Sequence, residues 1–191
     1  MLDKNPEKVL TADFQEILTE FSSKNPNIVL SSEPFLKSQF LIDLVNSSIE
    51  PVIFLDFDLL YSGYVYSGML TKNNRVEIYQ PDKNNIKKIF SDVANKISNK
   101  KHLVILDSFN GFYNMFTEME SGIFINAVTM LLSFVAREKD SMIIVSGMAR
   151  KKNNEGWVLL PGGRQIIESK NSGMYFLKRD EKSDFKITKF G

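Results

Sequence analysis

Apolar residues follow two kinds of spacing along this chain of 191 residues. Short apolar runs predict strands, and continuous ones are typical of strands covered on both faces. Such runs lie at residues 28–30, 52–60, 75–79, 102–108, 142–147, 173–179 and 184–190. Spacings of i, i+3, i+4 and i+7 predict helices. These stripes are Phe14, Ile17, Leu18 and Phe21, with Thr11 as the expected cap; Phe40, Leu41, Leu44 and Val45; Ile86, Ile89, Phe90, Val93 and Ile97; and one side of a long helix, Ile123, Ala127, Met130, Leu131 and Phe134.

The order of these elements predicts the fold class. Strands that alternate with helices favour an α/β fold with a mainly parallel sheet, and the last two strands favour a C-terminal antiparallel hairpin. Residues 61–74 and the aromatic segment 109–121 are expected to be irregular, and residues 150–155 to form a basic loop. The chain has 43% hydrophobic residues and no evident linker, so we expect a single domain over residues 1–191.

Residues 27–40, NIVLSSEPFLKSQF, have the layout of a phosphate loop, with a helix expected to begin near Lys37. In the intact motif G-x-x-x-x-G-K-[ST], backbone N–H groups cradle the phosphates, the lysine reaches them, and the hydroxyl binds magnesium. Lys37 and Ser38 keep this spacing, but Ser31 and Leu36 occupy the glycine positions. Leu36 is the larger departure, because a bulky residue is costly where the backbone approaches an anion. We therefore expect a nucleotide-binding fold with a damaged or lost site.

Composition excludes several other classes of site. The chain has no cysteine and one histidine, His102, so a thiol nucleophile, a disulfide framework or a Ser-His-Asp triad is not expected. The N-terminus lacks a signal-peptide core, and no apolar run approaches the roughly 18 residues that span a membrane. We expect a cytoplasmic protein without a membrane partner. Residues 137–191 hold 12 basic and 7 acidic residues although the net charge is only +1, which favours an anionic partner for that part.

Two stretches near the phosphate loop resemble the ATPase core of the RecA/RadA recombinases. KSQF at residues 37–40 is similar to the end of the family's phosphate loop. FLDFD at residues 54–58 is similar to the strand that precedes the family's water-activating glutamate, and Asp58 takes that place with one methylene fewer. Two further stretches follow in the family's order.

LVILDS at residues 103–108 resembles the second nucleotide motif, in which Asp107 would orient magnesium. LPGGR at residues 160–164 resembles the segment that closes the second DNA-binding loop. The chain is most similar to the RadB-like and recombinase-paralogue branch, over about residues 11–191. This resemblance implies a RecA-like P-loop NTPase core without a separate N-terminal DNA-binding domain, as a monomer or small oligomer.

The resemblance also implies which residues would face a nucleotide. ATP would meet Lys37, Ser38, Gln39 and Asp107, with Ser38 and Asp107 nearest the magnesium ion. The family's polar nucleotide sensor is replaced by Gly147 and Met148. Because the glycine cradle, the catalytic carboxylate at Asp58 and the sensor are all altered, we do not expect efficient ATP turnover. Any binding of ATP with magnesium is expected to be weak.

A DNA contact is expected in the second half of the chain. The resemblance places it at Arg150, Lys151, Lys152, Trp157 and Arg164. Basic side chains would neutralise phosphates, and the tryptophan would stack on an unpaired base. The aromatic residues 109–116 lie near the family's first DNA loop, but they could equally pack in the core or bind a partner. The leading hypothesis is an ATPase-deficient accessory factor of recombination or repair that binds single-stranded DNA, a RadA-type recombinase, or both.

Other interpretations remain open. Lys37 could be a solvated lysine, Asp107 a polar strand end, and residues 150–152 a solvated charge run beside a core tryptophan. Asp56 and Asp58 also fit the opening D-x-D of haloacid-dehalogenase-type phosphatases, although Leu59 and Leu60 replace the usual Gly-Thr. As a whole, the chain could be an ATPase-dead scaffold subunit, as in the Elongator assembly, or a weak ATPase.

Overall fold

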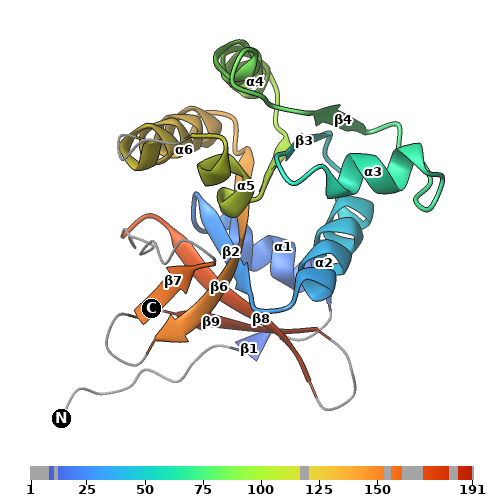
Figure 1. The fold of residues 1–191 in the computed structure, drawn as a ribbon, viewed down its shortest axis with the longest axis vertical. Coiled ribbons are helices and arrows are strands. Elements are labelled where there is room, and N and C mark those ends of the chain that lie inside the picture. The colour runs from blue at the N-terminus through green and yellow to red at the C-terminus, as the bar shows by residue number, and fades with distance from the viewer. Residues whose placement is uncertain are drawn as a thin grey trace.

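One large sheet forms the centre of the molecule. A computed structural model describes residues 9–10, 13–116, 121–152, 156–160, 170–180 and 185–190. Within them the strand order is β1-β9-β8-β2-β6-β5-β3-β4, and β7 pairs with β6 to one side (Figure 1). The strands are β1 (Val9–Leu10), β2 (Asn27–Ser31), β3 (Val52–Asp56), β4 (Val76–Tyr79), β5 (Leu103–Asp107), β6 (Met142–Lys152), β7 (Gly156–Leu159), β8 (Gly173–Arg179) and β9 (Phe185–Phe190). The run from β8 to β4 is parallel.

The C-terminal strands β8 and β9 pair antiparallel, with Met174 opposite Phe190 and Arg179 opposite Phe185. The predicted α/β class, with a mainly parallel sheet and a terminal hairpin, is therefore confirmed. The strands expected at residues 28–30 and 102–108 are found as β2 and β5, whereas the one expected at 52–60 ends at Asp56; β2, β3 and β5 are buried at every residue. A strand covered on both faces needs apolar side chains on both, which is why the runs are continuous.

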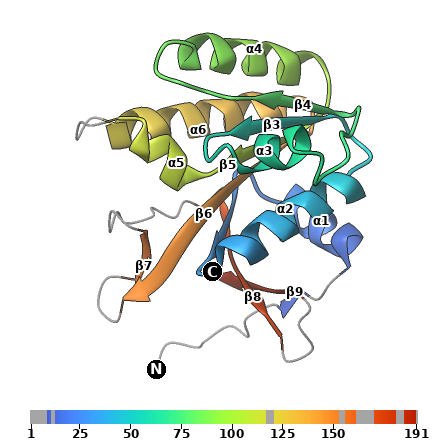
Figure 2. The same cartoon turned by 45° about the vertical axis from the view of Figure 1, so that its right-hand side comes forward.

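Helices cover both faces of the sheet (Figures 1 and 2). They are α1 (Phe14–Ser22), α2 (Pro34–Ser47), α3 (Leu60–Tyr66), α4 (Ile86–Asn99), α5 (Phe109–Asn114) and α6 (Ser121–Arg137). One core cluster joins α1, α2 and Tyr61 of α3 to the sheet. The other joins α4, α5 and α6 to the opposite face. Because the central strands are parallel, their carboxyl ends meet at one edge, where ligands of such sheets bind.

The helices differ from the sequence-based expectations at the cap of α1 and in the presence of α3 and α5. Helix α1 is capped by Asp13, whose carboxylate accepts the Gln15 N–H at 2.8 Å; the expected cap, Thr11, lies outside the described residues. Helices α3 and α5 occupy segments that we expected to be irregular. Each has seven or fewer residues, so neither is long enough to show a repeated apolar stripe.

Strand β6 is longer than its apolar run. It continues past the parallel sheet to Lys152 and pairs antiparallel with β7, so that Arg150 lies opposite Val158 and Lys151 opposite Trp157. The expectation of a basic loop over residues 150–155 was therefore wrong for its first part, which is strand. Residues 153–155 lie outside the described residues. The long arrow of β6 and the adjacent β7 project from the body of the sheet in Figure 2.

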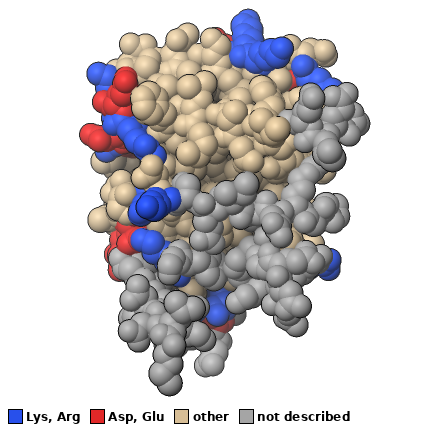
Figure 3. Space-filling view, turned by 90° about the vertical axis from the view of Figure 1, so that its left-hand side faces the viewer, with Lys and Arg blue, Asp and Glu red and all other residues tan. Residues whose placement is uncertain are grey.

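Helix α6 is apolar on two sides. Ile125, Leu132 and Ala136 are buried against the sheet and α4. The apolar side marked by the sequence faces away from the core: Ile123, Met130, Leu131 and Phe134 are exposed by 76%, 44%, 57% and 64%. Figure 3 shows a broad face of the molecule on which charged side chains lie mainly at the margins.

Candidate functional site

The phosphate-loop region contains a much shorter loop than its motif requires. Strand β2 ends at Ser31 and helix α2 begins at Pro34, so only Ser32 and Glu33 connect them. The expectation that the helix begins near Lys37 was wrong by one turn. Proline is favoured in the first turn of a helix, because its fixed φ suits the helix and its missing N–H is not needed there. Leu36 consequently lies inside the helix and is fully buried.

This short loop offers few donors to a phosphate. The Glu33 N–H donates to Ser31 Oγ at 3.1 Å, and Pro34 has no N–H to donate. Glu33 occupies the N-cap position of α2 without a side-chain cap bond. Its carboxylate lies 3.4 Å from the guanidinium of Arg179 on β8. A helix N-terminus normally attracts anions, but here the N-cap residue is itself acidic.

The side chain of Lys37 is committed to two carboxylates. Lys37 is 1% exposed, and its ammonium group donates to Asp107 and to Asp58 Oδ2 at 3.1 Å. Burial opposes the charged form of Lys37, but the charges of Asp107 and Asp58 outweigh it, so the pKa of this lysine is raised above 10.5. Lys37 is therefore not the solvated lysine of the alternative interpretation. We call Lys37, Asp58 and Asp107 the ion triad.

Backbone and side-chain contacts fix the ion triad at the carboxyl edge of the sheet. The N–H groups of Phe57 and Asp58 donate to the Asp107 carbonyl oxygen at 2.7 and 3.1 Å. The Ser146 hydroxyl of β6 donates to the Asp107 carboxylate. Strands β3, β5 and β6 thus hold the two aspartates in place for the lysine that α2 supplies. The sheet brings Lys37, Asp58 and Asp107 together, as the expected nucleotide site requires.

Asp56, the last residue of β3, is fully buried. Its Oδ2 accepts the Ser62 N–H at 2.7 Å, whereas its Oδ1 has no hydrogen-bond partner among the described residues. Burial raises the pKa of Asp56, and the charges of Asp107 and Asp58 add to the effect. A nucleophilic carboxylate must reach its substrate, so this burial argues against the phosphatase alternative.

The other expected nucleotide contacts point to different partners. Ser38 Oγ donates to the Pro34 carbonyl oxygen at 3.2 Å. The Gln39 amide donates to the Asp43 carboxylate at 3.0 Å, along the surface of α2. Neither side chain is directed by these contacts toward the ion triad. In the described residues, no group of three or more histidine, aspartate or glutamate side chains is arranged to hold a metal ion.

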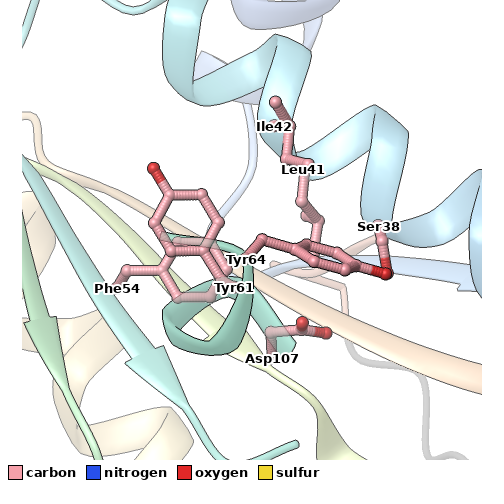
Figure 4. Close-up of a pocket in the computed structure, with 7 residues that line it drawn as sticks. All are labelled: Ser38, Leu41, Ile42, Phe54, Tyr61, Tyr64 and Asp107. Atoms are coloured by element: carbon pink, nitrogen blue, oxygen red, sulfur yellow. The ribbon is translucent and has the colours of Figure 1, made fainter. Parts of the chain in front are cut away.

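Aromatic side chains occupy the space beside the ion triad (Figure 4). Tyr61 of α3 is 4% exposed and stacks on Phe54, with ring centroids 4.2 Å apart. With Tyr64 and residues of α2 they leave a cavity of about 10 Å³ beside Ser38 and Asp107. That volume holds about one water molecule. The short loop and the lysine already paired with two carboxylates do not fit ATP with magnesium.

A second candidate site lies on the hairpin of β6 and β7. Arg150 is exposed on β6, and Lys151 and Lys152 continue the strand opposite Trp157 and Gly156. The structure therefore places four of the five expected DNA-binding residues in one hairpin. The fifth, Arg164, lies outside the described residues.

The hairpin is fastened to the body of the protein by Asn110. This α5 side chain accepts the Met148 N–H at 2.7 Å and donates to the carbonyl oxygens of Met148 and Leu160. Ser108, which follows Asp107, caps the same helix through Gly111 N–H at 3.2 Å. The expected core role fits the segment around it, since Phe109, Phe112 and Tyr113 are buried. A continuous set of contacts thus runs from the ion triad to the base of the hairpin.

Comparisons with known proteins found similar proteins by structure alone. No protein-family model matches the sequence, and no curated protein matches it. The crystal structure of the RadB recombinase matches with a TM-score of 0.54 at 14% identity, over 83% of this chain and 77% of that one. A second solved structure, described as an ATPase domain, matches with a TM-score of 0.51 at 12% identity, over 84% of this chain and 71% of that one. The fold is RecA-like.

Several residues of this RecA-like core escaped the sequence analysis. Ser146 and Asn110 act through bonds to Asp107 and Met148, which lie far from them in sequence, so no local pattern marks them. Pro34 was a visible signal, since proline in a first turn predicts a helix start.

The described residues include no helix long and apolar enough to cross a membrane.

Proposed function

We propose that this chain is an accessory factor of homologous recombination or DNA repair that works without a nucleotide cycle. It binds single-stranded DNA, a RadA-type recombinase, or both, and influences how the recombinase assembles. The RecA-like fold supports the general class. The ion triad supports the absence of a cycle, because the lysine expected to meet phosphate is neutralised by the two carboxylates expected to meet magnesium and water.

The ion triad is the observation that carries the proposal. Two carboxylates and one ammonium give this group a formal charge of −1, which repels a nucleotide polyphosphate. A phosphate that approached Lys37 would have to break the buried contacts of this lysine. Breaking a buried ion pair typically costs several kcal/mol. Asn110, three residues after Asp107, anchors the hairpin without a ligand.

The hairpin of β6 and β7 supports the DNA contact. Strand β6 continues beyond the parallel sheet with three consecutive basic residues, and this extension pairs with β7 (Figure 2). Each phosphate neutralised on a single strand contributes about 0.7 to the slope of log K against log salt. A tryptophan that stacks on a base contributes about 1–3 kcal/mol. A paired hairpin orders these groups before binding, which reduces the entropic cost.

We expect the triple substitution Arg150→Ala, Lys151→Ala and Lys152→Ala to weaken binding of single-stranded DNA. Removing three phosphate contacts lowers the salt slope by about 2. Trp157 is the sole tryptophan of the chain, so its fluorescence reports a titration with an oligonucleotide at several salt concentrations. The titration is performed with and without magnesium and ATP, and both conditions give the same affinity if the protein has no nucleotide cycle.

The matched control replaces Lys83, Lys87 and Lys88 by alanine. These lysines are exposed in and before α4, so the control removes the same charge elsewhere on the surface. An equal loss of affinity in both triple variants would assign binding to net charge rather than to the hairpin. A wild-type protein that binds no oligonucleotide, in fluorescence and in a label-free assay, would refute the DNA contact and favour the scaffold alternative.

A further inference from the structure

Helix α6 has a second apolar side that the described structure leaves uncovered. No charged residue occurs between Ser121 and Ala136. A surface helix normally has one apolar stripe and a charged opposite face, whereas a helix that is apolar all round is buried. The buried residues Ile125, Leu132 and Ala136 already satisfy the contact with the core. The exposed stripe is therefore additional to what the fold requires.

The exposed stripe is a continuous seam along the helix. Ile123, Ala127, Met130, Leu131 and Phe134 recur at intervals of three and four residues, which places them on one side of α6. A helix of 17 residues is about 25 Å long, so the seam runs along most of it. Contiguous exposed apolar surface marks an interaction site, and in Figure 3 few charged side chains lie within the part of this face that is described.

We propose that the occupant of this seam is α6 of a second copy of the chain, packed antiparallel about a two-fold axis. Identical surfaces repel when they carry net charge, but this seam carries none, so its copy meets no like-charge penalty. With the axis between Val128 and Thr129, Ile123 of one copy lies opposite Phe134 of the other. The small Ala127 lies opposite the larger Met130, which lets the two helices approach closely.

The charge pattern favours a second copy over a charged partner protein. A helix that docks a basic or acidic partner carries the opposite charge beside its apolar contact, and α6 offers no charged residue before Arg137. The expected affinity is modest, because one pair of helices covers less than the roughly 800 Å² per partner of a standard interface. We expect dissociation in the micromolar range, so that monomer and dimer interconvert with protein concentration.

The test is sedimentation velocity of the full chain between about 2 and 200 µM. The mass rises from 21.9 kDa toward twice that value if the proposal is correct. Leu131→Glu places one negative charge in the seam of each copy, so the two charges would lie close together in the dimer. We therefore expect this variant to remain monomeric or to have a dissociation constant at least tenfold higher than that of the wild type. Ile49→Glu is the matched control, because Ile49 is 82% exposed and lies outside α6; it dimerises as the wild type does.

A second measurement uses the absence of native cysteine. Under mild oxidation Ala127→Cys forms disulfide-linked dimers, whereas Ile49→Cys forms few. The proposal is overturned if the wild-type protein remains monomeric at 200 µM. It is also overturned if Leu131→Glu dimerises with the same dissociation constant as the wild type. Binding of the monomer to neutral lipid vesicles without self-association also overturns it, in favour of a membrane surface. The outcome is independent of the DNA titration, which tests the hairpin of β6 and β7.

Discussion

Replacing Lys37 by methionine lowers the free energy of unfolding by about 3–5 kcal/mol, the usual cost of removing one partner of a buried ion pair. Methionine nearly fills the volume of the lysine stem but leaves Asp107 and Asp58 without their cation. The Asp107 side chain is 3% exposed, so water gives it little compensation. Urea unfolding of the nucleotide-free protein measures the loss. A lysine that served only a phosphate would have no such role without ligand.

The control applies the same substitution to an exposed ion pair. Lys96 and Glu77 have side chains exposed by 37% and 49%, so Lys96→Met costs about 0–1 kcal/mol. Adding Asp58→Asn and Asp107→Asn to Lys37→Met recovers part of the stability, because the unpaired charges are gone. The buried ion triad would be contradicted by a Lys37→Met variant no less stable than Lys96→Met.

Restoring the missing glycine at position 36 destabilises the protein instead of repairing a nucleotide site. Leu36→Gly removes a fully buried side chain in the core that joins α1 and α2 to the sheet. Truncating a buried leucine costs about 2–5 kcal/mol, and glycine in a helix adds up to about 1 kcal/mol. We expect a total loss of about 3–5 kcal/mol, measured by urea unfolding, and no gain in affinity for ATP.

The neighbouring Phe35 separates the two contributions. It lies in the same helical turn but is 67% exposed, so Phe35→Gly loses mainly helix propensity, about 1 kcal/mol or less. Equal losses in the two variants would mean that Leu36 is not packed in the core. A Leu36→Gly protein of normal stability that binds ATP would support the loop geometry that the intact motif has.

The fold was predictable because its central strands and the stripe of α4 are unambiguous. Strands such as residues 103–107 must be apolar throughout to lie between two helix layers, and the stripe of α4 has a single buried side. For α6 the pattern predicted the helix but not its orientation, because both sides are apolar and no pattern tells which one faces the sheet. Helix α3 escaped because only Tyr61 and Ser62 of its residues are buried.

The candidate site was predictable in its composition but not in its contacts. The resemblance implied that Lys37, Asp58 and Asp107 share one site, and parallel strands that end together agree with this. Whether Lys37 faces a phosphate or the aspartates depends on where α2 begins and on how α3 places Tyr61 and Tyr64. Those are tertiary features that local sequence patterns do not determine. Because α2 begins at Pro34, one turn before Lys37, the loop that would bind phosphate is shortened.

The most direct test of this account is the free energy of unfolding with and without 5 mM magnesium-ATP. A ligand present at 100 times its dissociation constant stabilises the native state by about 2.7 kcal/mol. ATP that bound with a dissociation constant of about 50 µM would therefore raise the free energy of unfolding by about that amount. The ion triad predicts no shift beyond the one that the same concentration of magnesium sulfate and inorganic triphosphate produces. A specific gain of about 2 kcal/mol or more in the wild-type protein would contradict the account. The contradiction would be complete if Lys37→Met, which removes the lysine that would meet the phosphates, abolished this gain.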